Sequence, residues 1–207
     1  MEKVPAISGI VLAGGESRRM GTDKALLKLG GYTLIENVIA RVSRVSQEVI
    51  VVANALENYR NLGVKLVRDV FPGKGSLGGI YSGLLAANHF HSLVVACDMP
   101  FLNLDLLRYM IVLAPNYDVV IPCLDRGYKE ALHAIYSKNC LVPIENQLRR
   151  NHLKIIDFLD HVSVYYVEQE EIDLFDPQHL SFFNINTPAD MERAKDVMKG
   201  ADFDEGG

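Results

Sequence analysis

Short runs of apolar residues, rich in Val and Ile, recur along the chain and constrain its fold more than any other feature. Five of them, at 6–13, 48–53, 65–68, 93–97 and 118–122, are predicted to be β-strands. Most are apolar throughout instead of alternating, which is typical of parallel strands that are covered on both faces. Helical patterns lie between these runs, and strands that alternate with helices indicate a doubly wound α/β sheet.

The helical patterns of the first half are predicted at 34–45, 80–88 and 104–113. In the first of them the apolar residues recur on one face, as expected for a helix that packs on a sheet. Thr33 and Glu36 form a capping box at its start, because each side chain can accept from the backbone N–H group of the other residue.

After residue 122 the spacing of the elements changes. The elements predicted here are strands at 131–136, 162–168 and 182–185 and helices at 141–148 and 153–159. A closing helix follows, with Thr187 as its N-cap and Pro188 at its first position. No linker-like run divides this half from the first, so we predict a single domain over 1–199, followed by a disordered, glycine-rich tail at 200–207.

Composition and charge exclude several classes of protein. The 207 residues carry 21 Lys and Arg against 26 Asp and Glu, a net charge of −5, which argues against a general nucleic-acid binder. No apolar stretch is long enough to span a membrane. The three cysteines are odd in number and form no C-x-x-C pair, and no signal peptide is visible. We therefore expect a cytoplasmic protein that binds neither nucleic acid nor membrane.

The segment at 9–24 is the most informative, because a buried strand ends there in glycines and then cations. Gly14 and Gly15 let backbone N–H groups approach an anion closely. Arg19 and Lys24 then add positive charge where a triphosphate carries several negative charges. Open α/β sheets bind their ligands at this position, outside the carboxyl end of a strand. The segment is not a G-x-x-x-x-G-K-[ST] P-loop, so we predict a phosphate site of another kind.

A single carboxylate, Asp98, follows the apolar run at 93–97 and precedes Pro100, which ends the strand. Mg²⁺ needs only one or two carboxylates when phosphate oxygens and water complete its coordination. Asp69 ends another predicted strand and belongs to the same edge of the sheet. We predict that Asp98 binds Mg²⁺; a helix N-cap or a turn is the alternative role for this carboxylate.

Two other features have competing interpretations. Residues 73–78 match the G-x-G-x-x-G pattern of dinucleotide-binding oxidoreductases, but residues 70–72 separate them from their strand. We interpret these glycines as a second loop that closes over a nucleotide. His133 lies within a predicted strand, where it is interpreted as a core or interface histidine, with a role at an acceptor site as the alternative.

Five motifs, in order along nearly the whole chain, resemble the signature of the molybdenum cofactor guanylyltransferases. The first marks the wider nucleotidyltransferase superfamily, which includes sugar-phosphate and isoprenoid-precursor enzymes, and the last narrows the resemblance to the cofactor enzymes. The motifs are Leu12-Ala13-Gly14-Gly15 with Arg19-Met20-Gly21 and Asp23-Lys24-Ala25-Leu26-Leu27, then Leu77-Gly78-Gly79-Ile80, Cys97-Asp98-Met99-Pro100-Phe101, Leu132-His133-Ala134 and Asn184-Ile185-Asn186-Thr187-Pro188.

The resemblance implies a Rossmann-like, mostly parallel sheet of the nucleotide-diphospho-sugar-transferase type, with helices on both faces. It implies an Mg²⁺-dependent enzyme that transfers GMP from GTP to molybdenum-molybdopterin and releases pyrophosphate. Residues 6–122 would then be the nucleotide-binding half and 123–199 the acceptor-side half. Molybdoenzyme apoproteins or their chaperones would be further partners.

Site residues follow from the same resemblance, position by position. The set comprises Leu12, Ala13, Gly14 and Gly15 around the guanine, Lys24 and Arg19 at the phosphates, Asn54 and Asp69 at the nucleoside, Asp98 as the Mg²⁺ ligand, and Asn184 and Asn186 toward the acceptor. Lys24, Arg19 and Asp98 are the predicted catalytic residues. The chain departs from the family at Ser76, where proline is usual, and at Glu130-Ala131, where Gln-Pro is common.

Three alternatives stay open at this point. A cytidylyltransferase for the same cofactor would share the fold and the metal site and differ in its base pocket. A nucleotidyltransferase for another phosphorylated acceptor would differ on the acceptor side. A nucleotide-binding module without catalysis is the third alternative, although the presence of both Lys24 and Asp98 argues against it.

Overall fold

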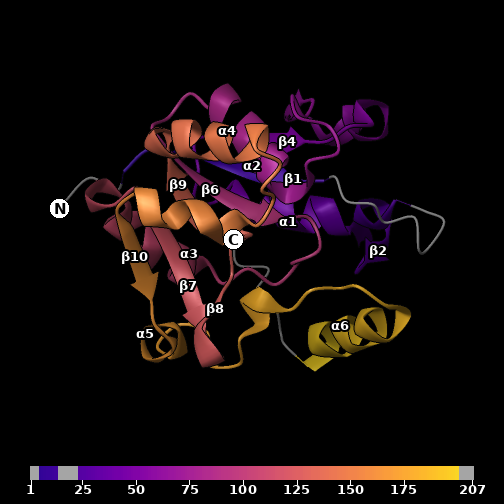
Figure 1. Ribbon diagram of the computed structural model, residues 1–207. Helices are drawn as coiled ribbons and strands as arrows, with labels where there is room; N and C mark the ends of the chain where they lie inside the picture. Colours follow the sequence, from indigo (N-terminus) through magenta and orange to yellow (C-terminus); the bar gives the residue numbers. More distant parts are fainter. Residues whose placement is uncertain (1–4, 14–22, 201–207) are drawn as a thin grey trace.

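A computed structural model describes residues 5–13 and 23–200 (Figure 1). Its main sheet has eight strands, seven of them in the order β10-β7-β9-β6-β1-β4-β5, with β8 paired to β7; β2 and β3 form a separate small sheet. The strands are β1 (Ile7–Leu12), β2 (Lys28–Leu29), β3 (Tyr32–Thr33), β4 (Glu48–Val52), β5 (Lys65–Val67), β6 (His91–Ala96), β7 (Val119–Leu124), β8 (Tyr128–Lys129), β9 (His133–Ser137) and β10 (Val164–Val167).

The sheet is mostly parallel, as predicted. Within the seven-strand path only β9 runs against its neighbours, pairing antiparallel with both β6 and β7. Its first residue, His133, pairs with Val95 near the carboxyl end of β6. The reversed strand therefore brings residues just before 133 to the edge where the parallel strands end, which is the edge that carries the site described below.

Helices cover both faces of this sheet, which confirms the doubly wound architecture. In β1 the side chains of Ile7 and Val11 face one core, and those of Ile10 and Leu12 face the other. The first core packs under α1 and α3, and the second under α2 and α4, which lie together in Figure 1. The α-helices are α1 (Leu34–Val42), α2 (Gly75–Ala86), α3 (Leu104–Leu113), α4 (Leu141–Arg149), α5 (Gln169–Asp173) and α6 (Pro188–Gly200).

Short 3₁₀ helices make up many of the connections, and the sequence pattern did not predict them as such. Those that matter for the site are η2 (Lys24–Leu26), η3 (Leu56–Leu62), η7 (Ile155–His161) and η8 (Leu180–Phe182). The predicted helix at 153–159 is therefore wrong in type, because its hydrogen bonds are those of a 3₁₀ helix. The predicted strand at 182–185 is also wrong. Its amide at Ile185 donates to the carbonyl of Asp98, in a loop, and not to a neighbouring strand.

The helix starts follow the predicted capping chemistry. Thr33 and Glu36 form the reciprocal capping box of α1. Thr187 Oγ1 accepts from the amide of Asp190, and Asp190 Oδ2 accepts from the amide of Thr187, so the same device starts α6 with Pro188 at its first position. The first of these helices ends at Val42, three residues before the predicted boundary at 45.

Helix α2 corrects the interpretation of the second glycine loop. It begins at Gly75, so most of the glycines in the 73–78 pattern are helical. Helical glycines are disfavoured by about 1 kcal/mol, and this is why the sequence favoured a loop. In α2 the glycines permit close packing. Gly83, farther along the helix, is an example, because a Cβ atom there would lie 2.6 Å from the side chain of Ile10 in β1. The glycines thus seat α2 directly on the central strand.

The two predicted halves share one sheet, because β7 crosses the proposed boundary between residues 122 and 123. The predicted tail overlaps the last residue of α6 at Gly200, and residues 201–207 lie outside the described part of the chain. None of the helices in the described ranges is long and apolar enough to cross a membrane.

Candidate active site

Three side chains from distant parts of the chain meet at the carboxyl edge of the sheet. Lys24 Nζ donates to Asp98 Oδ2 at 2.6 Å and to Asn186 Oδ1 at 2.7 Å. The Lys24 and Asp98 side chains are only 11% and 18% exposed, so water screens their ion pair incompletely. Roles were predicted for all three residues separately, and the structure brings them together in one cluster.

The backbone around each residue explains how this cluster forms. β6 ends at Ala96, and Asp98 lies two residues beyond it in a turn. Asn186 reaches Asp98 because its neighbour Ile185 donates a backbone hydrogen bond to the Asp98 carbonyl at 3.0 Å. Lys24 begins η2, whose N-cap is Asp23. The cap of α3 is a different residue, so the alternative role of Asp98 as its N-cap is wrong.

One oxygen of the cluster lacks a partner. Asp98 Oδ1 is buried and accepts no hydrogen bond from any described residue. Burying a carboxylate oxygen without a partner costs free energy, which a bound cation would recover. Within 5–13 and 23–200 no group of three or more His, Cys, Asp or Glu could hold a metal ion. The unpartnered Asp98 oxygen fits a cation such as Mg²⁺ only where phosphate oxygens and water supply the other ligands.

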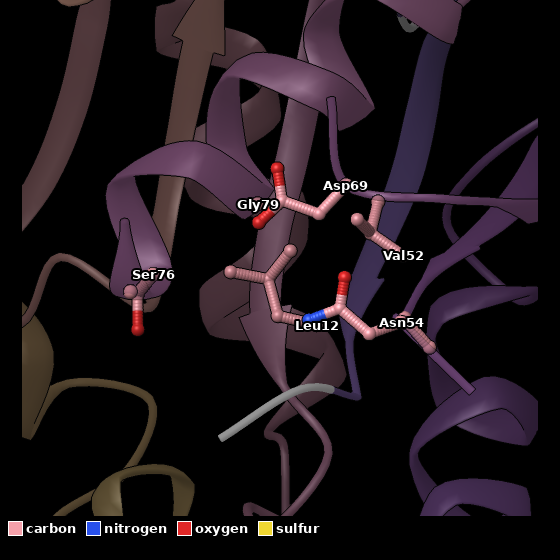
Figure 2. A pocket seen from close by; sticks show the side chains of 8 residues that line it. Leu12, Val52, Asn54, Asp69, Ser76 and Gly79 are labelled. Atoms are coloured by element: carbon pink, nitrogen blue, oxygen red, sulfur yellow. The ribbon is translucent and has the colours of Figure 1, made fainter. Parts of the chain in front are cut away.

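A pocket opens at the same edge, between the end of β1 and the start of α2. Its lining includes Leu12, Val52, Asn54, Asp69, Ser76 and Gly79, all labelled in Figure 2. Apolar side chains with one amide and one carboxylate suit a flat heteroaromatic ring that carries polar edges. The carbonyl of Leu12 accepts from the amide of Cys97 at 3.1 Å, so this pocket adjoins the strand end that carries Asp98.

Asp69 is a fixed part of this pocket. Its Oδ1 atom accepts from the amide of Phe71 at 2.9 Å and from Ser82 Oγ at 2.8 Å. A Cβ atom at Gly78 would lie 3.0 Å from Asp69 Oδ2, so only glycine lets α2 approach this carboxylate closely. The neighbouring residues thus orient the carboxylate before any ligand binds.

The remaining predicted site residues fall into two groups. Gly14, Gly15 and Arg19 lie outside the described residues. Ala13 follows β1, where its amide donates to Val52, and Asn184 only donates to the Phe182 carbonyl of its own turn at 3.2 Å. Asn184 and Asn186 do not lie on a strand, because the segment predicted as one at 182–185 is not a strand. Of the two, Asn186 is the one that joins the Lys24 cluster.

A family model described as the MobA-like NTP transferase domain matches residues 9–162, from β1 to just beyond η7. This is well over half of the chain. The chain belongs to the MobA-like NTP transferase family. The nucleotidyltransferase class that the motifs predicted is thereby confirmed.

Individual members of the family extend the comparison to the full chain. A probable molybdenum cofactor guanylyltransferase of Pelotomaculum thermopropionicum is 42% identical over 91% of this chain and 91% of its own length. A molybdenum cofactor guanylyltransferase of Desulfosudis oleivorans is 37% identical, with 94% and 96% covered. The resemblance to these enzymes that the motifs predicted is therefore confirmed.

Solved structures agree with this placement. The crystal structure of a molybdopterin-guanine dinucleotide biosynthesis protein A from Archaeoglobus fulgidus superimposes with a TM-score of 0.81 and 30% identity, covering 94% of this chain and all of that one. A 2-C-methyl-D-erythritol 4-phosphate cytidylyltransferase from Thermus thermophilus, at 19% identity and a TM-score of 0.67, shares the fold. The nucleotide-diphospho-sugar-transferase type of architecture is confirmed.

Glu130 adds a second carboxylate near the site of this MobA-like transferase. It precedes β9, is almost fully buried, and accepts from the amide of Leu132 at 3.2 Å. Burial raises the pKa of Glu130, and the negative charge of Asp98 raises it further. The amide of Ala96 donates to the Leu132 carbonyl at 3.1 Å, so Glu130 lies at the end of β6, the strand that leads to Asp98.

His133 lies in the core, as the sequence analysis favoured. It is fully buried, its ring packs 4.9 Å from that of Phe182, and its nitrogens make no hydrogen bond within the described ranges. Burial lowers the pKa of His133 to about 4, outweighing Asp176 and the Ser181 backbone, which both favour the charged ring. The imidazole is therefore neutral at physiological pH and serves packing around η8.

Acid should destabilise the protein through this histidine. Between pH 6.5 and about 4 the unfolded chain binds a proton at His133 that the folded chain does not, so stability falls as pH falls. The expected slope is on the order of 1.4 kcal/mol per pH unit. Urea unfolding of His133→Phe between pH 7 and pH 4.5 should show a flatter pH dependence than the parent. The same change at exposed His152 should leave the dependence intact; equal slopes in all three proteins would contradict this assignment.

Proposed function

We propose that this MobA-like transferase moves GMP from GTP to molybdenum-molybdopterin and releases pyrophosphate. The observation that carries the proposal is the junction of a polar pocket for a base with the Lys24–Asp98–Asn186 cluster. A nucleotide whose base occupies the pocket would direct its phosphates toward a buried lysine. The two relatives align with this chain over 91% and 96% of their own length, and their names support the choice of base and acceptor.

The chain's own residues would act mainly by position and charge. A phosphate oxygen of the acceptor attacks the α-phosphorus of GTP, a new P–O bond forms, and the bond to the β-phosphate oxygen breaks, so that pyrophosphate leaves. The acceptor phosphate is already ionised near neutral pH, and a general base is therefore unnecessary. Lys24, together with Arg19, would neutralise negative charge on the phosphates as the transferring phosphorus changes partners.

Mg²⁺ is proposed as the cofactor, held by the Asp98 oxygen that has no partner among residues 5–13 and 23–200. When bound, the ion would neutralise phosphate charge and hold the triphosphate in line for attack. Lys24 would then exchange part of its contact with Asp98 for contact with the phosphates. The Asp98 carboxylate would then bind the cation, and Lys24 would bind the negatively charged phosphates.

The acceptor is proposed to enter from the side of Asn186 and Glu130. Asn186 is exposed on its other side, and an amide can contact a phosphate or a polar pterin edge without adding charge. Glu130 stands where the family commonly has glutamine. This chain would therefore offer the incoming molybdenum-molybdopterin a carboxylate, which accepts hydrogen bonds, in place of an amide. Asn184, with its side chain turned to its own backbone, would affect the acceptor only indirectly.

The direct test is transfer itself. Purified protein is incubated with Mg²⁺, molybdenum-molybdopterin and either GTP or CTP, and pyrophosphate and the dinucleotide product are measured by mass spectrometry. Product with GTP and little with CTP supports the proposal. Product with CTP alone would reassign the chain to the cytidylyltransferases, and nucleotide binding without product from either triphosphate would indicate a module without catalysis.

Base preference should also appear in binding. In the presence of Mg²⁺, GTP should raise the melting temperature more than ATP, CTP or UTP at equal concentration. At a hundred times its dissociation constant a ligand stabilises by about 2.7 kcal/mol, which is roughly 5–10 °C for a chain of this size. The wrong base leaves buried polar groups unpaired, at about 1–3 kcal/mol each. Equal shifts for all four triphosphates would contradict a base-reading pocket.

A further inference from the structure

The side chain of Tyr59 contacts both Ala13 and Asp23, which flank the residues at 14–22 in the sequence. Tyr59 lies in η3 with 1% of its surface exposed, inside the core beneath α1. Its hydroxyl donates to Asp23 Oδ2 at 2.5 Å and lies 3.3 Å from the carbonyl oxygen of Ala13. A hydroxyl has one proton, so the short contact to the carboxylate is the strong hydrogen bond and the contact to Ala13 is the weak one.

Asp23 passes this restraint on to Lys24. Its Oδ1 atom accepts from the amide of Ala25 at 3.2 Å, and its carbonyl accepts from the amide of Leu26 at 3.0 Å. These bonds form the cap and first turn of η2, in which Lys24 is the first residue. The orientation of the Lys24 side chain therefore depends on where the Asp23 carboxylate is held.

We propose that Tyr59 is a positioning residue for nucleotide binding, which acts through Asp23 to hold Lys24 against Asp98. The proposal rests on the nucleotide site described above and adds to it a residue that does not line the base pocket. A rigid aromatic ring anchored in the core holds its hydroxyl more firmly than a flexible side chain would. Burial and the hydrogen bond to Asp23 raise the pKa of Tyr59, so the phenol stays protonated and remains a donor throughout the neutral range.

The test removes the hydroxyl and keeps the ring. Tyr59→Phe should lower GTP affinity in Mg²⁺, measured by calorimetry, roughly tenfold, which corresponds to about 1.4 kcal/mol. The decisive measurement repeats the change in a Lys24→Ala background, where Tyr59→Phe should have no further effect, because the residue it positions is gone. If GTP does not bind, whichever of the four triphosphates binds the parent most tightly is used instead.

A matched control separates positioning from general loss of stability. Tyr109→Phe removes a hydroxyl that hydrogen-bonds Glu171 between α3 and α5, and it should lower the melting temperature without changing nucleotide affinity. Asp23→Asn, which keeps an oxygen for the Tyr59 hydroxyl, should lose less affinity than Asp23→Ala. Equal losses of affinity from Tyr59→Phe with and without Lys24 would overturn the proposal. So would unchanged affinity in Tyr59→Phe alone.

The proposed function and this inference fail in different ways. Coupling between Tyr59 and Lys24 is read from nucleotide binding, whereas the choice of acceptor is read from product. Coupled binding without transfer to molybdenum-molybdopterin would remove the assigned reaction and support the role of Tyr59. Transfer with additive effects of the two substitutions would do the reverse.

Discussion

Asp98→Asn should lower the rate of nucleotidyl transfer by about 10²–10³-fold or more while the protein remains folded. Loss of one electrostatic contact in a transition state typically costs that factor, and a metal ligand should cost at least as much. Asparagine keeps the shape of the side chain and an oxygen for Lys24, so it removes charge without emptying the site. Turnover is measured as pyrophosphate release at several Mg²⁺ concentrations, with folding checked by circular dichroism.

The variant Asp98→Ala should be at least as inactive. Its melting temperature should also fall, because the Lys24 side chain, only 11% exposed, loses its ionic partner. Asp105→Asn is the control, since that carboxylate is mostly exposed and pairs with Arg108 on the surface of α3. It should leave both activity and stability nearly unchanged. Turnover of Asp98→Asn within tenfold of the parent at moderate Mg²⁺ would show that the metal assignment is wrong.

Replacing Lys24 with alanine should have the second largest effect, weakening GTP binding about 10–100-fold and slowing transfer as well. A hydrogen bond to a charged group is worth about 1.5–3 kcal/mol, and Lys24 would contribute one to the phosphates both before and during reaction. Both the dissociation constant and kcat should therefore change. Calorimetry gives the first and a single-turnover assay the second.

Lys28→Ala provides the comparison, because Lys28 is a lysine only four residues beyond Lys24. Lys28 is exposed on β2, and a charge on the surface contributes little. Because salt in ordinary buffer screens such a charge, its loss should change GTP affinity by less than about threefold. Comparable losses of GTP affinity from both substitutions would show that the two lysines act as a diffuse positive field and that Lys24 has no specific contact with the phosphates.

The fold was largely predictable because its strands are buried on both faces. β1, β4 and β6 are almost entirely buried and end in apolar runs, which are typical of a parallel sheet covered on both faces. The failures occurred where short patterns are ambiguous. Asn184-Ile185-Asn186 alternates over too few residues to distinguish a strand from a loop, and the amide of Ile185 donates to the Asp98 carbonyl. The glycines at the start of α2 read as a loop by propensity, although a Cβ atom at Gly78 would lie 3.0 Å from Asp69 Oδ2.

The residues of the Lys24 cluster could be singled out from the sequence, but their arrangement could not. Asp98 was identified from its position after an apolar strand and Lys24 from its place beside the glycines. Their direct pairing across 74 residues, and the addition of Asn186, depend on tertiary packing that local patterns do not encode. Tyr59 carried no usable signal, since a tyrosine in a polar segment is as easily exposed as buried. Only its 1% exposure and its contact with Asp23 reveal it.

The contact between Lys24 and Asn186 spans 162 residues, and Asn186 lies beyond the region that the family model matches. During synthesis, every strand of the main sheet has been translated before this asparagine leaves the ribosome. A nascent chain can therefore build its sheet, whose last strand ends at Val167, before Lys24 can make its contact with Asn186. The cluster of Lys24, Asp98 and Asn186 is thus complete only after residue 186 has been added, so a chain that stops between Val167 and Asn186 would hold every strand of the main sheet without this contact.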